Sequence, residues 1–137
     1  MASQELIDGL NHALNREVGT FLRYMLQAAS IKGAQWEPVR VLYASEVQDE
    51  VGHAQLLANA IRALGGKPTL APDLTAPPED VKTMLANDIE QERIDVAHYI
   101  KLSQLAEKEG YFSLKMKMEE QAADEDGHAN ELKRLLS

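Results

Sequence analysis

Cysteine is absent from the 137-residue chain. Disulfides, thiolate zinc sites, iron–sulfur clusters and thiol catalysis are therefore excluded. A chain of this length can bury one continuous core without such staples, so we expect a single domain over residues 1–137. The lack of cysteine suits a reducing cytoplasm without establishing it.

Long apolar runs are lacking too. None approaches the roughly 18 residues that a membrane-spanning helix needs. Residues 1–5 also lack the basic start and apolar stretch of a secretory signal. We therefore expect a soluble, cytoplasmic protein with no membrane partner.

Basic residues are in the minority, with 14 Lys and Arg against 22 Asp and Glu and a formal net charge of −8. Nucleic-acid binding requires a basic face, so no nucleic acid is expected as a partner. An acidic surface instead concentrates cations, which is compatible with metal handling.

Proline and glycine divide the chain into four long segments. Four of the five prolines lie between residues 68 and 78, where a helix cannot continue. Gly33 and Pro38 bracket an earlier turn, and Gly110 marks a later one. Within the segments, apolar side chains recur at spacings of three and four, which predicts an all-α fold. The expected helices cover about 4–32, 37–64, 78–109 and 111–136, with a crossover at 65–77.

The length of the crossover predicts the topology. Fully extended, residues 65–77 span at most about 43–47 Å. A helix over residues 37–64 is about 42 Å long, so the crossover can just run the length of a bundle. This favours two antiparallel hairpins joined by one long crossover, although an up-down-up-down bundle would also tolerate the loop.

The second half of the chain repeats a pattern of the first half. An offset of 75 residues places identical residues over one another: Glu17 on Glu92, Tyr24 on Tyr99, Glu50 on Glu125 and His53 on His128. The segments 49–54 and 124–129 both read Asp-Glu-x-Gly-His-Ala. We infer two duplicated hairpins related by a pseudo-two-fold axis.

Six polar residues interrupt the apolar stripes of these helices. Ionised carboxylates in a core are costly unless they are paired or bound to a metal. Glu-x-x-His places both side chains on one helix face, and two such pairs plus two further Glu residues form the ligand set of di-iron and di-manganese bundles. The predicted ligands are Glu17, Glu50, His53, Glu92, Glu125 and His128.

The ligand types suit iron or manganese, and zinc would also bind. Each histidine is expected to cap one of two ions. Glu50 and Glu125 are the better candidates for bridging carboxylates by geometry, with Glu17 and Glu92 terminal, although the reverse assignment stays open.

Further polar residues are expected around the ligands. Tyr24 and Tyr99 lie two turns after Glu17 and Glu92, where a phenol would bond a ligand carboxylate, supply an electron, or simply fill the core. Asp88 and Gln121 are candidates to orient the histidines. For Glu46, one turn before Glu50, we favour a solvated side chain over a role as an iron entry or exit ligand.

The chain resembles the bacterioferritin and rubrerythrin branch of the ferritin-like superfamily, from about Leu6 to Leu136. The residues from Leu10-Asn11 through Glu17 to Tyr24 are similar to the first bacterioferritin helix, and the run from Asp88 to Glu92 is similar to the third. The resemblance implies a ferritin-like four-helix bundle whose site binds two ferrous ions. It further implies their oxidation by dioxygen or hydrogen peroxide, for iron storage or for peroxide removal.

Several residues of this chain differ from the patterns of these families, and they narrow the expected cofactor and assembly. Val51 stands where bacterioferritins have a haem-binding methionine, so no haem is expected. The chain ends at Ser137 without the fifth helix of storage ferritins, which argues against a 24-subunit cage. Asp95 takes the place of an additional rubrerythrin ligand, and the four-cysteine electron-transfer module is missing. A peroxidase of this kind would take electrons from a separate donor or from the ferrous ions.

Four functions therefore compete. The leading one is a non-haem di-iron oxidoreductase, a ferroxidase or peroxidase. The others are an iron-storage cage subunit, a di-manganese catalase and a bundle in which the metal is only structural. A homodimer or larger homo-oligomer is expected in each case.

Overall fold

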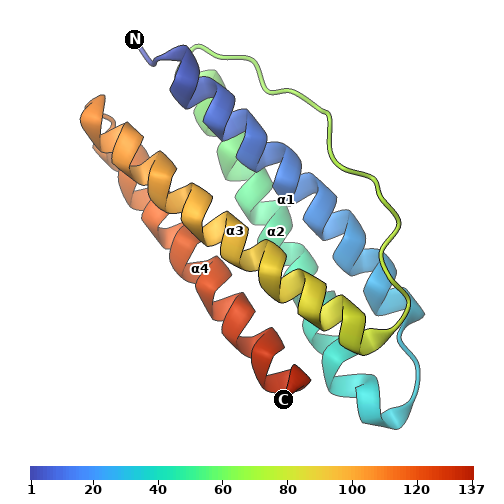
Figure 1. The fold of residues 1–137 in the computed structure, drawn as a ribbon. Coiled ribbons are helices and arrows are strands. Elements are labelled where there is room, and N and C mark those ends of the chain that lie inside the picture. The colour runs from blue at the N-terminus through green and yellow to red at the C-terminus, as the bar shows by residue number, and fades with distance from the viewer.

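The computed structural model describes residues 1–137 as a bundle of four long helices (Figure 1). The helices are α1 (Gln4–Ser30), α2 (Glu37–Ala63), α3 (Val81–Lys108) and α4 (Phe112–Leu136), and a short 3₁₀ helix, η1 (Ala34–Trp36), precedes α2. None of these helices has a stretch that is long and apolar enough to cross a lipid bilayer.

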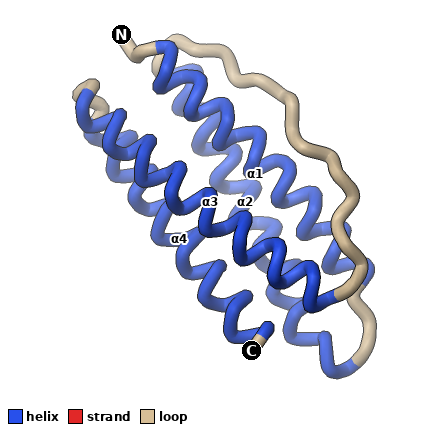
Figure 2. The backbone as a smooth tube through the Cα atoms, viewed as in Figure 1, coloured by secondary structure: helices blue, strands red, loops and turns tan.

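The helices form two hairpins, α1 with α2 and α3 with α4. The segment between α2 and α3 is a loop that runs beside α1 from one end of the bundle to the other (Figure 2). The predicted topology of two hairpins and one long crossover is therefore confirmed.

Helix α3 begins at Val81, later than the expected residue 78. Asp80 is its N-cap, and the Asp80 carboxylate accepts a hydrogen bond of 3.0 Å from the backbone N–H of Thr83. Pro77 and Pro78 consequently stay in the crossover. At the first turn, α1 ends at Ser30 instead of residue 32, and Gly33 adopts a φ of 100° that favours glycine.

Side chains of α1 hold the crossover in place. Asn11 Oδ1 accepts a hydrogen bond of 2.8 Å from the backbone N–H of Thr69, and Asn15 Oδ1 accepts one of 2.6 Å from that of Ala71. One turn further along, a Cβ on Gly19 would lie 3.1 Å from the Asp73 carbonyl oxygen. Two asparagines one turn apart thus hold the extended loop against α1, and Gly19 lets the loop backbone approach the helix closely.

The apolar core is divided into two clusters. The larger has 14 buried residues, including Leu6, Leu57 and Met118, and the smaller has 8, including Tyr43 and Leu85. The buried polar residues are a third of the 36 that are buried, and several of them separate the two clusters.

Truncating the larger cluster should destabilise the whole bundle. Leu57 is completely buried, so Leu57→Ala is expected to lower the free energy of unfolding by about 2–5 kcal/mol, measured by urea denaturation. Leu74→Ala is the matched control because Leu74 lies in the crossover with 73% of its surface exposed. A loss of similar size at Leu74 would contradict this description of the core.

Candidate metal centre

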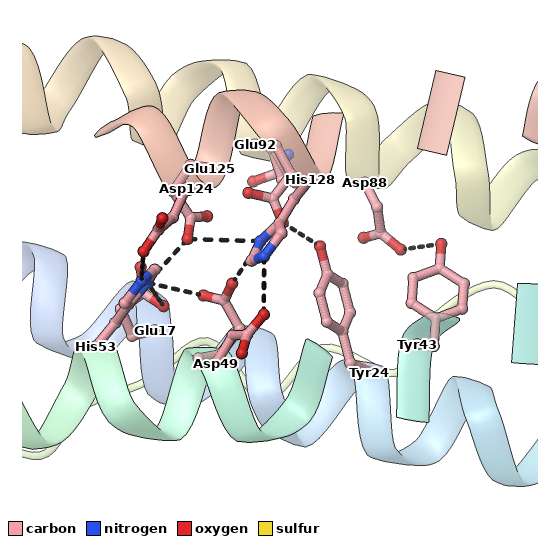
Figure 3. Close-up of polar contacts among 12 residues, drawn as sticks. Glu17, Tyr24, Tyr43, Asp49, His53, Asp88, Glu92, Asp124, Glu125 and His128 are labelled. Carbon is pink, nitrogen blue, oxygen red and sulfur yellow. Dashed lines mark hydrogen bonds and ion pairs between the residues drawn. The ribbon is translucent and has the colours of Figure 1, made fainter. Parts of the chain in front are cut away.

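The six predicted ligands converge between the two apolar clusters. Every helix contributes: Glu17 from α1, Glu50 and His53 from α2, Glu92 from α3, and Glu125 and His128 from α4. All four glutamates are at most 1% exposed. Figure 3 shows five of the six, Glu17, His53, Glu92, Glu125 and His128, with their side chains directed toward one another between the helices.

These residues form two overlapping groups, each with four ligand atoms within 4.8 Å of one another. The first group is Glu17, Glu50, His53 and Glu125, and the second is Glu50, Glu92, Glu125 and His128. Glu50 and Glu125 belong to both groups, whereas each remaining residue belongs to one. The arrangement is consistent with a diiron-carboxylate site whose two halves share two carboxylates.

Each histidine is held from both sides of its ring. His53 Nδ1 lies 2.9 Å from Glu125 Oε1, and its Nε2 lies 3.0 Å from Asp124 Oδ2. His128 repeats the pattern, with Nδ1 3.0 Å from Glu50 Oε1 and Nε2 3.2 Å from Asp49 Oδ2. Each aspartate therefore reaches across to the histidine of the opposite hairpin.

Asp49 and Asp124 were missed by the sequence reasoning, which expected Asp88 and Gln121 to orient the histidines. A signal was present, because an aspartate precedes the ligand glutamate in both copies of Asp-Glu-x-Gly-His-Ala. These aspartates, and not Asp88 or Gln121, contact the histidines because of how α2 faces α4: each aspartate bonds a histidine of the other helix.

Asp88 has different partners altogether. Its carboxylate accepts hydrogen bonds from Tyr43 Oη at 2.7 Å, Gln27 Nε2 at 2.8 Å and Arg23 Nε at 2.8 Å. It is completely buried and compensated by the Arg23 guanidinium. This network lies beside the smaller apolar cluster and fastens α1, α2 and α3 together.

The two repeated tyrosines bond the ligand carboxylates. Tyr99 Oη donates a hydrogen bond of 2.6 Å to Glu17 Oε1, and Tyr24 Oη donates to Glu92 Oε1. Both phenols are buried and each crosses from one hairpin to the other. Of the alternatives open at the sequence level, the hydrogen bond to a ligand is therefore present.

Asp95 lies outside both four-atom groups. Its carboxylate pairs with Arg16 Nε, and Arg16 also donates to Gln91 Oε1 at 3.0 Å. A carboxylate neutralised in this way is a poor additional ligand. The structure thus gives Asp95 a cationic partner on α1.

Glu46 and Gln121 differ from expectation in another way. Glu46 is only 3% exposed, so its interpretation as a solvated side chain is wrong. Gln121 is equally buried, and no side-chain oxygen or nitrogen of either residue has a hydrogen-bond partner. Burial raises the pKa of Glu46 to about 8.

The clustered carboxyl groups strongly perturb one another. Burial raises the pKa of Glu17 and of Glu125 well above the ordinary carboxyl value, and neighbouring carboxylates raise both further. Burial likewise raises the pKa of Glu92 to about 7. At Glu50, burial acts in the same direction but is outweighed by polar contacts with Glu17 and the two histidines, so its pKa is lowered.

Burial acts on the pKa values of the histidines in the opposite direction, because it lowers them. Burial disfavours the imidazolium form, but contacts with Glu17 and Glu50 outweigh burial and raise the pKa of His53 to about 11. Burial is outweighed in the same way at His128, whose contact with Glu50 raises its pKa to about 9. Protons therefore supply the positive charge that the cluster requires when no cation is bound.

The carboxylate oxygens that remain without hydrogen bonds could bind a pair of cations. Apart from the close approach of the histidine Nδ1 atoms, no polar group satisfies either oxygen of Glu50 or of Glu125, one oxygen of Glu17 or one of Glu92. Unsatisfied buried carboxylates are costly, and bound cations would satisfy them. Two divalent ions would balance the four negative charges.

Comparisons with known proteins agree with this geometry. A ferritin-like diiron-carboxylate protein from Bacillus anthracis str. Ames has a solved structure that is 36% identical, with a TM-score of 0.93 over 98% of this chain and 96% of that one. The dodecameric thioferritin of Bacteroides fragilis, a bacterioferritin-related protein, is 26% identical, with a TM-score of 0.86 over 97% of this chain and 84% of that one.

More distant bacterioferritins share the fold. That of Desulfovibrio desulfuricans is 22% identical and has a TM-score of 0.87 over 96% of this chain and 78% of its own. No curated protein sequence matches the chain significantly. The family of ferritin-like domains, described as Ferritin, matches residues 7–137. With nearly its whole length covered by that match, the chain belongs to the ferritin-like domain family.

Proposed function

We propose that the buried cluster binds two iron ions and that the protein oxidises Fe(II) with dioxygen or hydrogen peroxide. The observation that carries the proposal is the pair of overlapping four-atom groups, in whose glutamates six buried carboxylate oxygens accept no hydrogen bond. The solved Bacillus anthracis relative supports it, because that protein is described as a diiron-carboxylate protein.

In this proposal Glu50 and Glu125, which belong to both groups, would help to hold both ions, while Glu17 and Glu92 would each help to hold one. His53 and His128 would each offer Nδ1 to one ion. Their Nε2 atoms donate to Asp124 and Asp49, which selects the tautomer that leaves Nδ1 free for a metal. No haem belongs to the centre.

Two ferrous ions held at this site would supply two electrons to the oxidant and become ferric. The protein's part is to hold the carboxylates in place and keep the reaction away from bulk water. Tyr99 and Tyr24 each donate a hydrogen bond to a terminal carboxylate and so limit its rotation. A cycle that consumes peroxide needs electrons from further ferrous ions or from a separate donor protein, in the cytoplasm as the proposed compartment.

Iron oxidation is the direct test. Protein loaded anaerobically with Fe(II) is expected to develop ferric absorbance in a stopped-flow experiment when dioxygen or hydrogen peroxide is mixed in. Glu50→Ala removes a ligand shared by both ions, so we expect a loss of at least about 100-fold, beyond the roughly 10–100-fold typical for outer-shell changes. Glu90→Ala, on the exposed side of α3, is the control and should oxidise iron normally.

The alternatives predict other results. Metal binding that raises thermal stability without turnover by either oxidant would contradict the proposal and favour a structural role. Dioxygen release from peroxide by the manganese form would favour a di-manganese catalase. Growth of a large ferric mineral would favour storage.

The pH dependence gives a second test. The raised pKa values of Glu92 (about 7) and His128 (about 9) mean that the metal-free native state holds more protons than the unfolded chain near neutrality. Its stability should therefore be full below the ordinary carboxyl and imidazole pKa values and fall as pH rises from 6 to 9. Metal affinity should increase over the same interval because the ions displace these protons.

Thermal unfolding of the metal-free and cobalt(II)-loaded forms checks both statements. The melting temperature of the metal-free form should decrease with pH, and the increment produced by metal should grow. A metal-free melting temperature that rises between pH 6 and 9 would contradict the assigned proton positions.

We also propose that the protein forms a homodimer or a larger homo-oligomer. Met25 and Leu26 on α1 and Val41 on α2 are each about half exposed, which supports a buried contact in an assembly. The Bacteroides fragilis thioferritin is dodecameric. Light scattering should give a mass well above the 15.2 kDa of one chain, and a monomer would contradict the assembly.

A further inference from the structure

The duplicated pattern of the two hairpins changes at several buried positions beside the ligands, and at one of them it leaves a buried carboxyl group without an arginine partner. The offset of 75 residues that superimposes the ligands also places Glu46 on Gln121. Each residue lies one turn before a shared glutamate, Glu46 before Glu50 and Gln121 before Glu125. Both are 3% exposed, so the difference is a buried carboxyl group in one hairpin and a neutral amide in the other.

Glu46 lies near one half of the centre. The charges that act on its carboxyl group include those of His128, Glu92 and Glu50, all members of the second four-atom group. Its charge also acts on Tyr24, the phenol that bonds Glu92. Gln121 holds the equivalent place relative to the first group, with Glu17 and His53, under the pseudo-two-fold relation.

No arginine or lysine pairs with Glu46. Three buried acidic residues are not in the four-atom groups: Glu46, Asp88 and Asp95. Asp88 pairs with Arg23, and Asp95 pairs with Arg16. Neither oxygen of Glu46 has a hydrogen-bond partner, so the compensating charge comes from the adjacent half, from the His128 imidazolium in the metal-free protein and from a cation when one is bound.

We propose that Glu46 makes the position formed by Glu50, Glu92, Glu125 and His128 the higher-affinity cation site, so that the two positions fill in a defined order. The inference rests on the proposed dinuclear centre and adds that its halves are unequal. Glu46 acts as a positioning residue through its charge, because its oxygens are not among the four ligand atoms of that group.

The physical basis is the interaction of a buried charge with a divalent ion. In a partly buried environment, one unit charge attracts another several times more strongly than in water. A glutamine in the same place supplies only a dipole, so the first position lacks this attraction. The two sites therefore share identical ligand types but differ in the field around them.

Calorimetric titration of metal-free protein with cobalt(II) tests the inference without any redox reaction. The native protein should show two binding steps whose dissociation constants differ by roughly tenfold or more. Glu46→Gln places a glutamine at this position in both halves and should give two binding steps of similar, weaker affinity. Gln121→Glu places a glutamate at this position in both halves and should tighten the weaker step.

Ligand variants locate the two steps. His128→Gln should remove the tighter step, whereas His53→Gln should remove the weaker one. Circular dichroism establishes that each variant is folded. In addition, Glu46→Gln should raise the melting temperature of the metal-free protein while weakening cobalt binding, because it removes a buried carboxyl group that has no hydrogen-bond partner. A merely structural role would not produce opposite signs.

The outcomes separate the inference from the proposed function. If fewer than two cobalt ions bind, the dinuclear centre itself is wrong. If two bind with equal affinity, or with unequal affinities that Glu46→Gln and Gln121→Glu leave unchanged, the centre stands and the role of Glu46 is overturned.

Discussion

Four glutamates facing one another inside a helical bundle constitute the constraint on which the rest of this structure depends. Their mutual repulsion and desolvation act against folding, and nearby arginines do not neutralise them, since Arg16 and Arg23 pair with other carboxylates. Positive charge must therefore enter the centre as protons or as cations. The raised pKa values of Glu92, His53 and His128 express this requirement in the metal-free protein.

The surroundings of the centre keep it in place despite that cost. An apolar cluster lies on either side of it, and cross-hairpin hydrogen bonds tie the halves together. Tyr24 and Tyr99 hold carboxylates, and Asp49 and Asp124 hold imidazoles. Because each bond joins one hairpin to the other, the packing of the hairpins and the geometry of the centre depend on each other.

Duplication accounts for the near symmetry of the centre, and departures from the repeat account for the differences between its two halves. The ligands, tyrosines and aspartates occur in both halves, so the basic framework is two-fold. Glu46 and Gln121 break the equivalence without changing a ligand. A change of one buried charge is a small step in sequence, yet it alters the electric field at one of the two four-atom groups far more than an exposed charge would.

The sequence by itself determined the helices, the hairpin topology and the six clustered residues. Helical period, proline positions and the 75-residue repeat are local or one-dimensional signals, and they carry this information without knowledge of contacts. The end of the proline-rich crossover was placed less well, because the Asp80 cap and not the last proline starts α3.

Only the tertiary structure decided which side chains surround the ligands. Asp88 and Asp95 looked like helpers of the centre, but arginines from α1 pair with both. Glu46 looked solvated and is buried, and Asp49 and Asp124 were overlooked although they bond the histidines. The physical reason is that periodicity places a residue on a helix face, whereas its partner depends on how neighbouring helices are rotated and spaced.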